Sequence, residues 1–154
     1  MTPAPPGLRH ALNLDVEVGA PVEVGATAAG IRRLVPITGG TVSGPLLSGR
    51  ILPGGTDYQL IRTETWTEVE ARYVVETDRG ELVYVWNRGV RTGSAEDIAR
   101  LRRDEPVDPA RIYFRSSPTF ETSSERLAGL TARLFVGTGA RHPRSVVFDF
   151  YEVL

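Results

Sequence analysis

Apolar and polar residues alternate with a period of two along most of the chain, in short stretches interrupted by glycine or proline. Residues 12–18 show the pattern most clearly, with leucine or valine at every second position and Asn13, Asp15 and Glu17 between them. Successive side chains of a strand point to opposite faces, so this segment predicts a strand with one apolar face. Further strands are expected over residues 22–24, 31–37, 41–42, 46–52, 58–63, 67–76, 81–87, 111–115, 130–136 and 146–153.

Turn sequences predict how these strands connect. Asp78-Arg79-Gly80 favours a hairpin between residues 67–76 and 81–87. Glycine-containing turns are also expected at Gly39-Gly40, Gly54-Gly55 and Gly137-Thr138-Gly139. The hairpin arm 81–87 is apolar on both faces, which predicts a central strand with the barrel interior on one side and a helix or a neighbouring subunit on the other.

One short helix is expected near residues 95–103. Ser94 and Asp97 form a short-acid version of a capping box, and Ile98 and Leu101 give the segment an apolar stripe. Many short strands with one helix predict an all-β fold, a single antiparallel β-barrel.

The chain is expected to fold as one domain, because its 154 residues fall within the usual range for a single domain. The proline-rich residues 1–7 are expected to be a flexible N-terminal segment, and residues 8–154 the β-barrel domain. No apolar run is long enough for a signal peptide or a membrane-spanning helix. We therefore expect a cytoplasmic protein without a membrane partner.

Composition excludes several kinds of chemistry. All 18 basic residues are arginine and there is no cysteine, which excludes lysine Schiff bases, thiol nucleophiles and thiolate metal sites within this chain. His10 and His142 lie far apart and favour exposed loop positions over a metal site, so we expect neither a metal nor a cofactor. The 19 acidic and 18 basic residues are interspersed, which argues against a nucleic-acid partner.

Polar residues within the strands are the first candidates for a site. Alternation allows two registers around Asp57 and Gln59: either both face solvent while Tyr58 points inward, or both face a cavity and meet a ligand. Glu70 and Arg72 leave the same choice, a solvated face or a buried ligand contact.

Residues where strands meet loops are the second set of candidates. Asn87-Arg88 closes the central hairpin arm, and Tyr113 and Arg115 lie just after the expected helix. An arginine here can bind a carboxylate or enolate, or it can pair with Glu121 or Asp108 to hold a loop.

The chain resembles the bacterial domain-of-unknown-function family numbered three-two-three-seven. The resemblance extends from Leu12 to Leu154 and is carried by residues 33–44, 52–59, 71–73, 84–89, 113–115, 120–122 and 135–139. It implies an allene-oxide-cyclase-like β-barrel, with a lipocalin-like barrel as the alternative fold, and no settled activity.

Three functions are compatible with these observations. The first is a barrel that binds a small apolar or aromatic metabolite with an anionic or carbonyl group, using Gln59, Arg72, Tyr73, Tyr84, Trp86, Asn87, Arg88, Arg115 and Phe120. The second is a cofactor-independent lyase, isomerase or cyclase with Asp57 or Glu70 as base and Tyr113 as proton donor. The third is a dimer-forming accessory domain whose barrel is filled by its own side chains. The protein is expected to be a homo-oligomer, with a dimer favoured.

Two structural expectations separate these hypotheses. The interior is expected to contain Tyr73, Val75, Phe135 and either Val83 or Tyr84. One shared pocket is expected to contain Asp57, Gln59, Arg72, Asn87, Arg88, Tyr113 and Arg115. A carboxylate whose pKa is raised by burial beside an apolar cavity would favour the enzyme, and a cavity without titratable groups would favour the binding protein.

Overall fold

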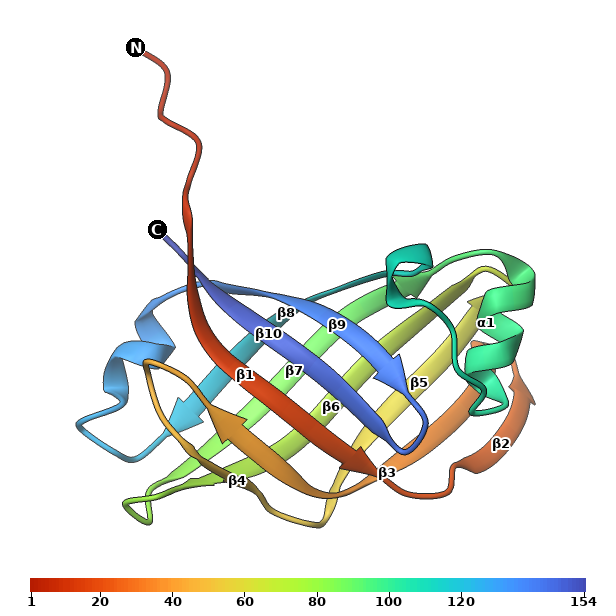
Figure 1. Ribbon diagram of the computed structural model, residues 1–154, viewed down its shortest axis with the longest axis horizontal. Coiled ribbons are helices and arrows are strands. Elements are labelled where there is room, and N and C mark those ends of the chain that lie inside the picture. Colours follow the sequence, from red (N-terminus) through yellow and green to blue (C-terminus); the bar gives the residue numbers. More distant parts are fainter.

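A computed structural model describes all 154 residues and confirms an all-β barrel with one short helix (Figure 1). The strands are β1 (Leu8–Val18), β2 (Val22–Thr27), β3 (Gly30–Ser43), β4 (Gly49–Ile51), β5 (Gly55–Thr63), β6 (Trp66–Thr77), β7 (Leu82–Thr92), β8 (Tyr113–Thr122), β9 (Phe135–His142) and β10 (Ser145–Val153). The helices are α1 (Ala95–Arg102) and the 3₁₀ segments η1 (Pro109–Arg111) and η2 (Ala128–Ala132). No helix is both long and apolar enough to cross a membrane.

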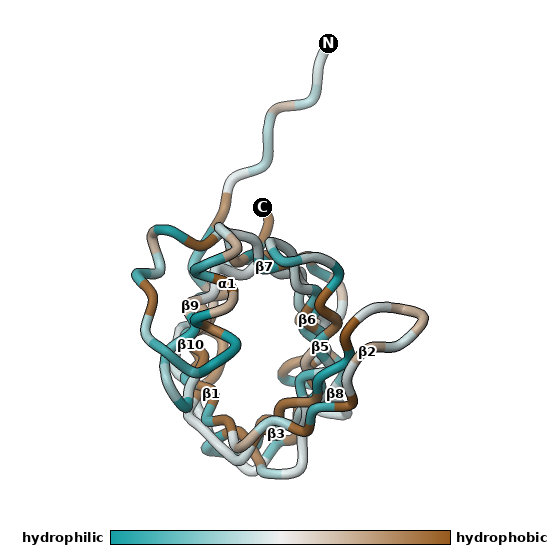
Figure 2. The backbone as a smooth tube through the Cα atoms, turned by 90° about the vertical axis from the view of Figure 1, so that its right-hand side faces the viewer, coloured by the Kyte–Doolittle hydropathy of each residue, from teal (hydrophilic) through white to brown (hydrophobic).

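Eight strands close into an antiparallel ring in the order β1, β10, β9, β8, β7, β6, β5, β3 and back to β1. Figure 2 looks along the barrel and shows this ring. The long strand β3 makes closure possible, because its first half pairs with β5 and its second half pairs with β1. The short strand β4 lies between β3 and β6, as β5 does, and pairs with both, whereas β2 pairs only with β3.

Two of the predicted glycine turns are wrong, because these glycines lie inside strands. Gly40 pairs with Val16 at a φ of 139°, where a Cβ would overlap the backbone carbonyl oxygen of Asp15. Gly139 lies inside β9, where a Cβ would stand 2.8 Å from the ring of Phe148. Both glycines allow a close approach that any side chain would block. The turn at Gly54 and the hairpin turn at Gly80 are confirmed.

Inward side chains fill one end of the barrel with a packed apolar core. Phe120 packs edge-to-face against Phe135 and Phe150, with ring centroids 5.0 and 6.1 Å apart. Leu127 and Leu130, at η2, belong to the same cluster and cover this end. Burial of the residues expected in the interior is confirmed: Tyr73, Val75, Val83 and Phe135 are each at most 3% exposed.

Helix α1 lies at the opposite end of the barrel (Figure 1). Ser94 caps it by accepting a hydrogen bond from the Asp97 backbone N–H at 3.1 Å. Its apolar stripe, Ile98 and Leu101, is buried in a small separate cluster with Val107. Arg33 of β3 donates from Nη2 to the Arg102 carbonyl at 3.0 Å, which fixes the C-terminal end of the helix to the barrel wall.

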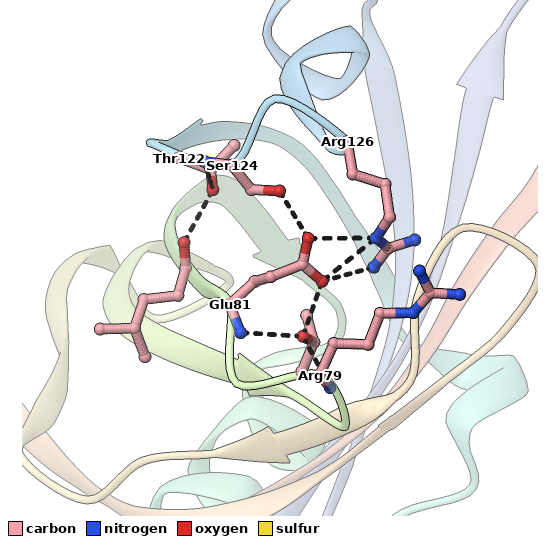
Figure 3. Close-up of polar contacts among 7 residues, drawn as sticks. Arg79, Glu81, Thr122, Ser124 and Arg126 are labelled. Carbon is pink, nitrogen blue, oxygen red and sulfur yellow. Dashed lines mark hydrogen bonds and ion pairs between the residues drawn. The ribbon is translucent and has the colours of Figure 1, made fainter.

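A polar network around Glu81 secures the apolar end from outside (Figure 3). The Glu81 carboxylate accepts hydrogen bonds from Arg126 at 2.6 Å, Ser124 at 2.5 Å and Thr77 at 2.9 Å. These bonds tie the β6–β7 turn to the segment after β8. The hydrogen bonds from Arg126, followed by that from Ser124, lower the pKa of Glu81 to about 2.

We expect Gly40→Ala to lower the free energy of unfolding by at least about 3 kcal/mol, because the new methyl group would meet the Asp15 carbonyl and the φ is unfavourable for alanine. Urea denaturation measures this. Gly129→Ala is the control, since a Cβ at Gly129 has no atom within 4 Å. Equal midpoints for the two variants would show that β1 and β3 need no glycine to pair.

The Glu81 network should make stability depend on pH between about 4.5 and 2. A carboxyl whose pKa is depressed in the folded state stabilises the protein above its ordinary pKa of 4.5, and this contribution disappears as pH falls through the folded pKa. The wild type should therefore exceed Glu81→Gln in urea midpoint at pH 6, and the difference should shrink towards pH 2. Glu125→Gln, in the same segment, is the control. A constant difference across this range would refute the role of the Glu81 charge.

Candidate functional site

The inward face of the barrel changes from apolar to polar towards the α1 end. In β7, Val83 and Val85 face inward, and the same alternation brings Asn87 and Arg91 inside, where they are 2% and 3% exposed. In β5, Gln59 is 3% exposed while the neighbouring Tyr58 is 40% exposed. Polar side chains from adjacent parts of the wall therefore meet inside the barrel.

A small internal cavity, with room of about 30 Å³, lies among these residues. Its wall is mostly apolar, with Val16, Val35, Ile37, Ala71, Phe114 and Phe148 among the residues that line it. Asp57, Gln59, Tyr73, Asn87 and Arg141 supply its polar groups. The free room corresponds to one water molecule or one small functional group.

Asp57 is held in this cavity by two hydrogen bonds. Its Oδ2 accepts from Gln59 Nε2 at 2.8 Å, and its Oδ1 accepts from the Glu70 backbone N–H at 3.0 Å. Tyr58 and Gln59 have no partner residue where β5 pairs with β6. At this gap in the pairing, the Asp57 carboxylate accepts the hydrogen bond of the Glu70 backbone N–H. Burial raises the pKa of the Asp57 carboxyl, and the Gln59 bond and the charge of Arg91 oppose this rise only in part.

Arg91 is a buried cation without a paired carboxylate. Its guanidinium stacks 5.5 Å from the ring centroid of Phe114, and its Nε has no hydrogen-bond partner. Burial lowers its pKa to about 10, against the attraction of Asp57, so the side chain is still charged at neutral pH. Other interior arginines do have acidic partners: Arg33 Nε lies 3.0 Å from Glu23, and Arg141 Nη2 lies 2.9 Å from Asp104.

Several buried polar atoms around the cavity have no hydrogen-bond partner in the protein. Gln59 Oε1, Tyr73 Oη and Asn87 Oδ1 belong to residues that line it, and Arg91 Nε lies further along the same face of β7 as Asn87. Buried polar atoms in folded proteins are nearly always paired, so a group of orphans is typical of a site completed by a ligand or water. Burial also raises the pKa of Tyr73, which keeps its hydroxyl protonated and able to donate.

A second cavity, of about 290 Å³, lies between α1 and the barrel wall. It is lined by Arg33, Gln59, Ile61, Glu64, Thr67, Arg91, Ala95, Ile98, Ala99 and Arg102. Gln59 lines both cavities, so the two spaces adjoin at this side chain.

The structure brings together four of the residues predicted for the site: Asp57, Gln59, Tyr73 and Asn87. Of the two registers open for Asp57 and Gln59, the one that faces the cavity is observed. Phe120 is also buried, but it packs in the apolar core. The catalytic or binding roles of these residues stay predictions.

Five other candidates lie together on the outer face of β6 and β7: Glu70, Arg72, Tyr84, Trp86 and Arg88. The Trp86 ring lies between the guanidinium groups of Arg72 and Arg88, whose Cζ atoms are 4.7 and 4.5 Å from its centroid. Glu70 Oε1 accepts from Trp86 Nε1 at 3.0 Å. The outer face of β7 is thus covered by arginine side chains, where a helix or subunit was predicted.

Tyr113 and Arg115 are also outside the cavity. Tyr113 is 55% exposed, and the Arg115 guanidinium stacks on its ring at 5.1 Å and pairs with neither Glu121 nor Asp108. The prediction of one shared pocket is therefore wrong for Arg72, Arg88, Tyr113 and Arg115. The physical reason is strand alternation, which turns these positions outward.

Sequence reasoning missed Arg91, together with Arg33 and Arg141. The signal was present, since Arg91 follows Asn87 by four residues and shares its face of the strand. The predicted strand ended at Asn87, whereas β7 continues to Thr92.

Comparison with known proteins agrees with this architecture. The family model described as "Protein of unknown function (DUF3237)" matches residues 6–153. A UPF0311 protein of Rhodopseudomonas palustris is 44% identical over 146 residues, 95% of both chains, and one of Clostridium acetobutylicum is 37% identical over 142 residues, 92% of this chain and 90% of that protein.

Solved structures show the same fold. The crystal structure of the Rhodopseudomonas palustris protein matches with a TM-score of 0.92 at 43% identity and full coverage of both chains. A "beta-barrel like protein" of Acinetobacter baumannii matches with a TM-score of 0.87 at 38% identity, covering 99% of both chains. A structure titled as an enzyme from Penicillium herquei matches with a TM-score of 0.74 at 20% identity, covering 100% of this chain and 98% of that one, and shows likeness of fold alone.

Asp57→Asn should change how stability depends on pH. A carboxyl whose pKa is raised by folding contributes fully below its ordinary value of 3.8, and this contribution is lost as pH rises through the folded pKa. The urea midpoint of the wild type should therefore fall relative to that of Asp57→Asn as pH rises from about 4 to 8. Asp15→Asn, on an exposed aspartate of β1, is the control. A difference that grows in the opposite direction would show that Asp57 is stabilised as an anion.

Proposed function

Because the chain belongs to the DUF3237 family of proteins of unknown function, we propose its function from the barrel interior: it binds a small molecule with a carbonyl or anionic oxygen and moves a proton on it, without a cofactor. Asp57 is the proposed base and acid. Tyr73 and Asn87, which line the same cavity, are proposed to hold the oxygen on which negative charge develops.

One observation carries this proposal: a half-buried carboxylate lies beside orphaned polar atoms in an otherwise apolar cavity. A raised pKa brings a carboxyl closer to the pH at which it can both accept and return a proton. The two hydrogen bonds from Gln59 and Glu70 fix its direction before a ligand enters.

The proposed step is the transfer of a proton from a carbon next to a carbonyl group to Asp57, with the electron pair of that bond moving to the carbonyl oxygen as an enolate. Hydrogen bonds from the Tyr73 hydroxyl and the Asn87 side-chain amide would stabilise this oxyanion. Return of the proton to another carbon completes an isomerisation, and loss of a leaving group or ring closure completes a lyase or cyclase reaction. The cavity beside Asp57 has room for the reacting group alone, so the rest of the ligand would occupy the cavity under α1.

A second candidate function is binding without chemistry. Both Asp57 oxygens already accept hydrogen bonds, which favours a role in orienting the Gln59 amide towards a ligand. Only a measurement of proton transfer separates the two functions.

The test is exchange of carbon-bound hydrogen in D₂O, with phenylacetone and related small enolisable ketones as probes. We expect the wild type to accelerate deuterium uptake next to the carbonyl, and Asp57→Asn to lower the rate at least about 100-fold, the usual contribution of a general base. Glu70→Gln should keep the activity, because the Glu70 side chain lies on the outer face. Mass spectrometry gives the rates.

Ligand binding detected by NMR with no accelerated exchange of any bound ketone would contradict proton transfer and support the binding protein. Loss of exchange in Glu70→Gln but not in Asp57→Asn would place the base on the outer face of the barrel and contradict the role of Asp57.

A further inference from the structure

We infer that the cavity between α1 and the barrel is a carboxylate-binding subsite organised by Arg91, so that the ligands are small organic acids with an apolar body. This deepens the proposed function and rests on it only for the reacting end of the ligand. The anchoring end is argued independently, from Arg91 and its surroundings.

The first argument is the missing counter-charge of Arg91. The side chain is 3% exposed, its Nε has no partner and it forms no ion pair. A buried charge without an opposite charge is costly, and proteins keep such a group where a ligand completes it. The planar guanidinium offers paired N–H donors that match the two oxygens of a carboxylate.

The second argument is the charge of the cavity wall. Arg33, Arg91 and Arg102 line it, and Glu64 is its single acidic residue. Arg33 is engaged with the Arg102 carbonyl at 3.0 Å and lies 3.0 Å from Glu23. The side chains of Arg91 and Arg102 form no ion pair, and Arg91 is the buried one of the two, in a wall that favours anions.

The third argument is the shape and polarity of the remaining wall. Ala95, Ile98 and Ala99 of α1 and Ile61 of β5 give the cavity an apolar side. Its volume of about 290 Å³ lies at the lower end of the range for small-molecule pockets. An acid with a short aliphatic chain or one aromatic ring suits both the size and the polarity.

The position of Gln59 connects this subsite to Asp57. Gln59 lines both cavities and donates to Asp57 at 2.8 Å. A ligand anchored by its carboxylate at Arg91 would pass this amide and present its next carbons to Asp57. The substrate class that follows is a carboxylic acid with an enolisable or otherwise acidic carbon a few bonds from the carboxylate.

Binding of phenylacetate and its neutral isostere phenylacetamide tests the subsite at pH 7 by ligand-observed NMR or calorimetry. We expect phenylacetate to bind the wild type at least about tenfold more tightly, since only the acid pairs with the guanidinium. Arg91→Gln should abolish this preference, and Arg91→Lys should keep only part of it because the planar fork is lost. Arg50→Gln, an exposed arginine paired with Glu76, is the matched control and should bind as the wild type does.

A second variant tests the location without changing the charge. Ala99→Phe should weaken binding of both probes by filling the cavity from α1. Thermal unfolding of each variant confirms that it is folded. Four results would overturn the inference. Two concern the preference: equal affinity of the wild type for the two probes, or a preference that survives Arg91→Gln. The other two are full competition by inorganic phosphate and no binding of phenylacetate to the wild type at about 10 mM.

The Asp57→Asn variant separates this inference from the proposed function. It should keep the preference for phenylacetate, because Arg91 is unchanged. If the preference is present but the wild type exchanges no carbon-bound hydrogen, the carboxylate subsite stands and the proton transfer is refuted. If exchange of neutral ketones is present without a preference for the acid, the proton transfer stands and the subsite is refuted.

Discussion

Closure of the barrel removes bulk water from every inward side chain, and the remaining features of the structure follow from this constraint. Apolar residues satisfy this constraint by packing against one another, as Phe120, Phe135 and Phe150 do at the end near η2. Polar residues meet it only through bonds with one another or with a ligand. At the α1 end Asp57 finds two partners and Arg91 finds no paired carboxylate, so the polar end of the barrel is incomplete as a purely structural element.

The two ends of the barrel therefore have different roles. The apolar end carries packed aromatic rings and the Glu81 network. This end supplies stability to an interior that keeps a desolvated carboxyl and a cation at the other end. Groups that weaken the folded state are commonly retained where function needs them, which supports a functional origin for Asp57 and Arg91.

Much of the fold could be predicted from the sequence, because strand alternation, the Asp78-x-Gly80 turn and the Ser94 cap are local signals. The site was harder to predict for physical reasons. Alternation alone does not say which face of residues 57–59 is inside, and this depends on the register with β3 and β6. Gly40 looked like a turn because its real constraint, the neighbouring Asp15 carbonyl, is distant in sequence. The aromatic Trp86 was predicted to form a cavity wall. It points outward instead, and the guanidinium groups of Arg72 and Arg88 cover its ring.

The account depends most on the state of the Asp57 carboxyl inside the barrel. The most direct measurement is an NMR titration of the Asp57 side-chain carboxyl carbon in ¹³C-labelled protein, assigned with the Asp57→Asn variant. Burial beside an apolar cavity predicts a titration midpoint clearly above the ordinary value of 3.8. A midpoint at or below this value would show a fully solvated or ion-paired carboxylate and would contradict a buried proton-transfer site.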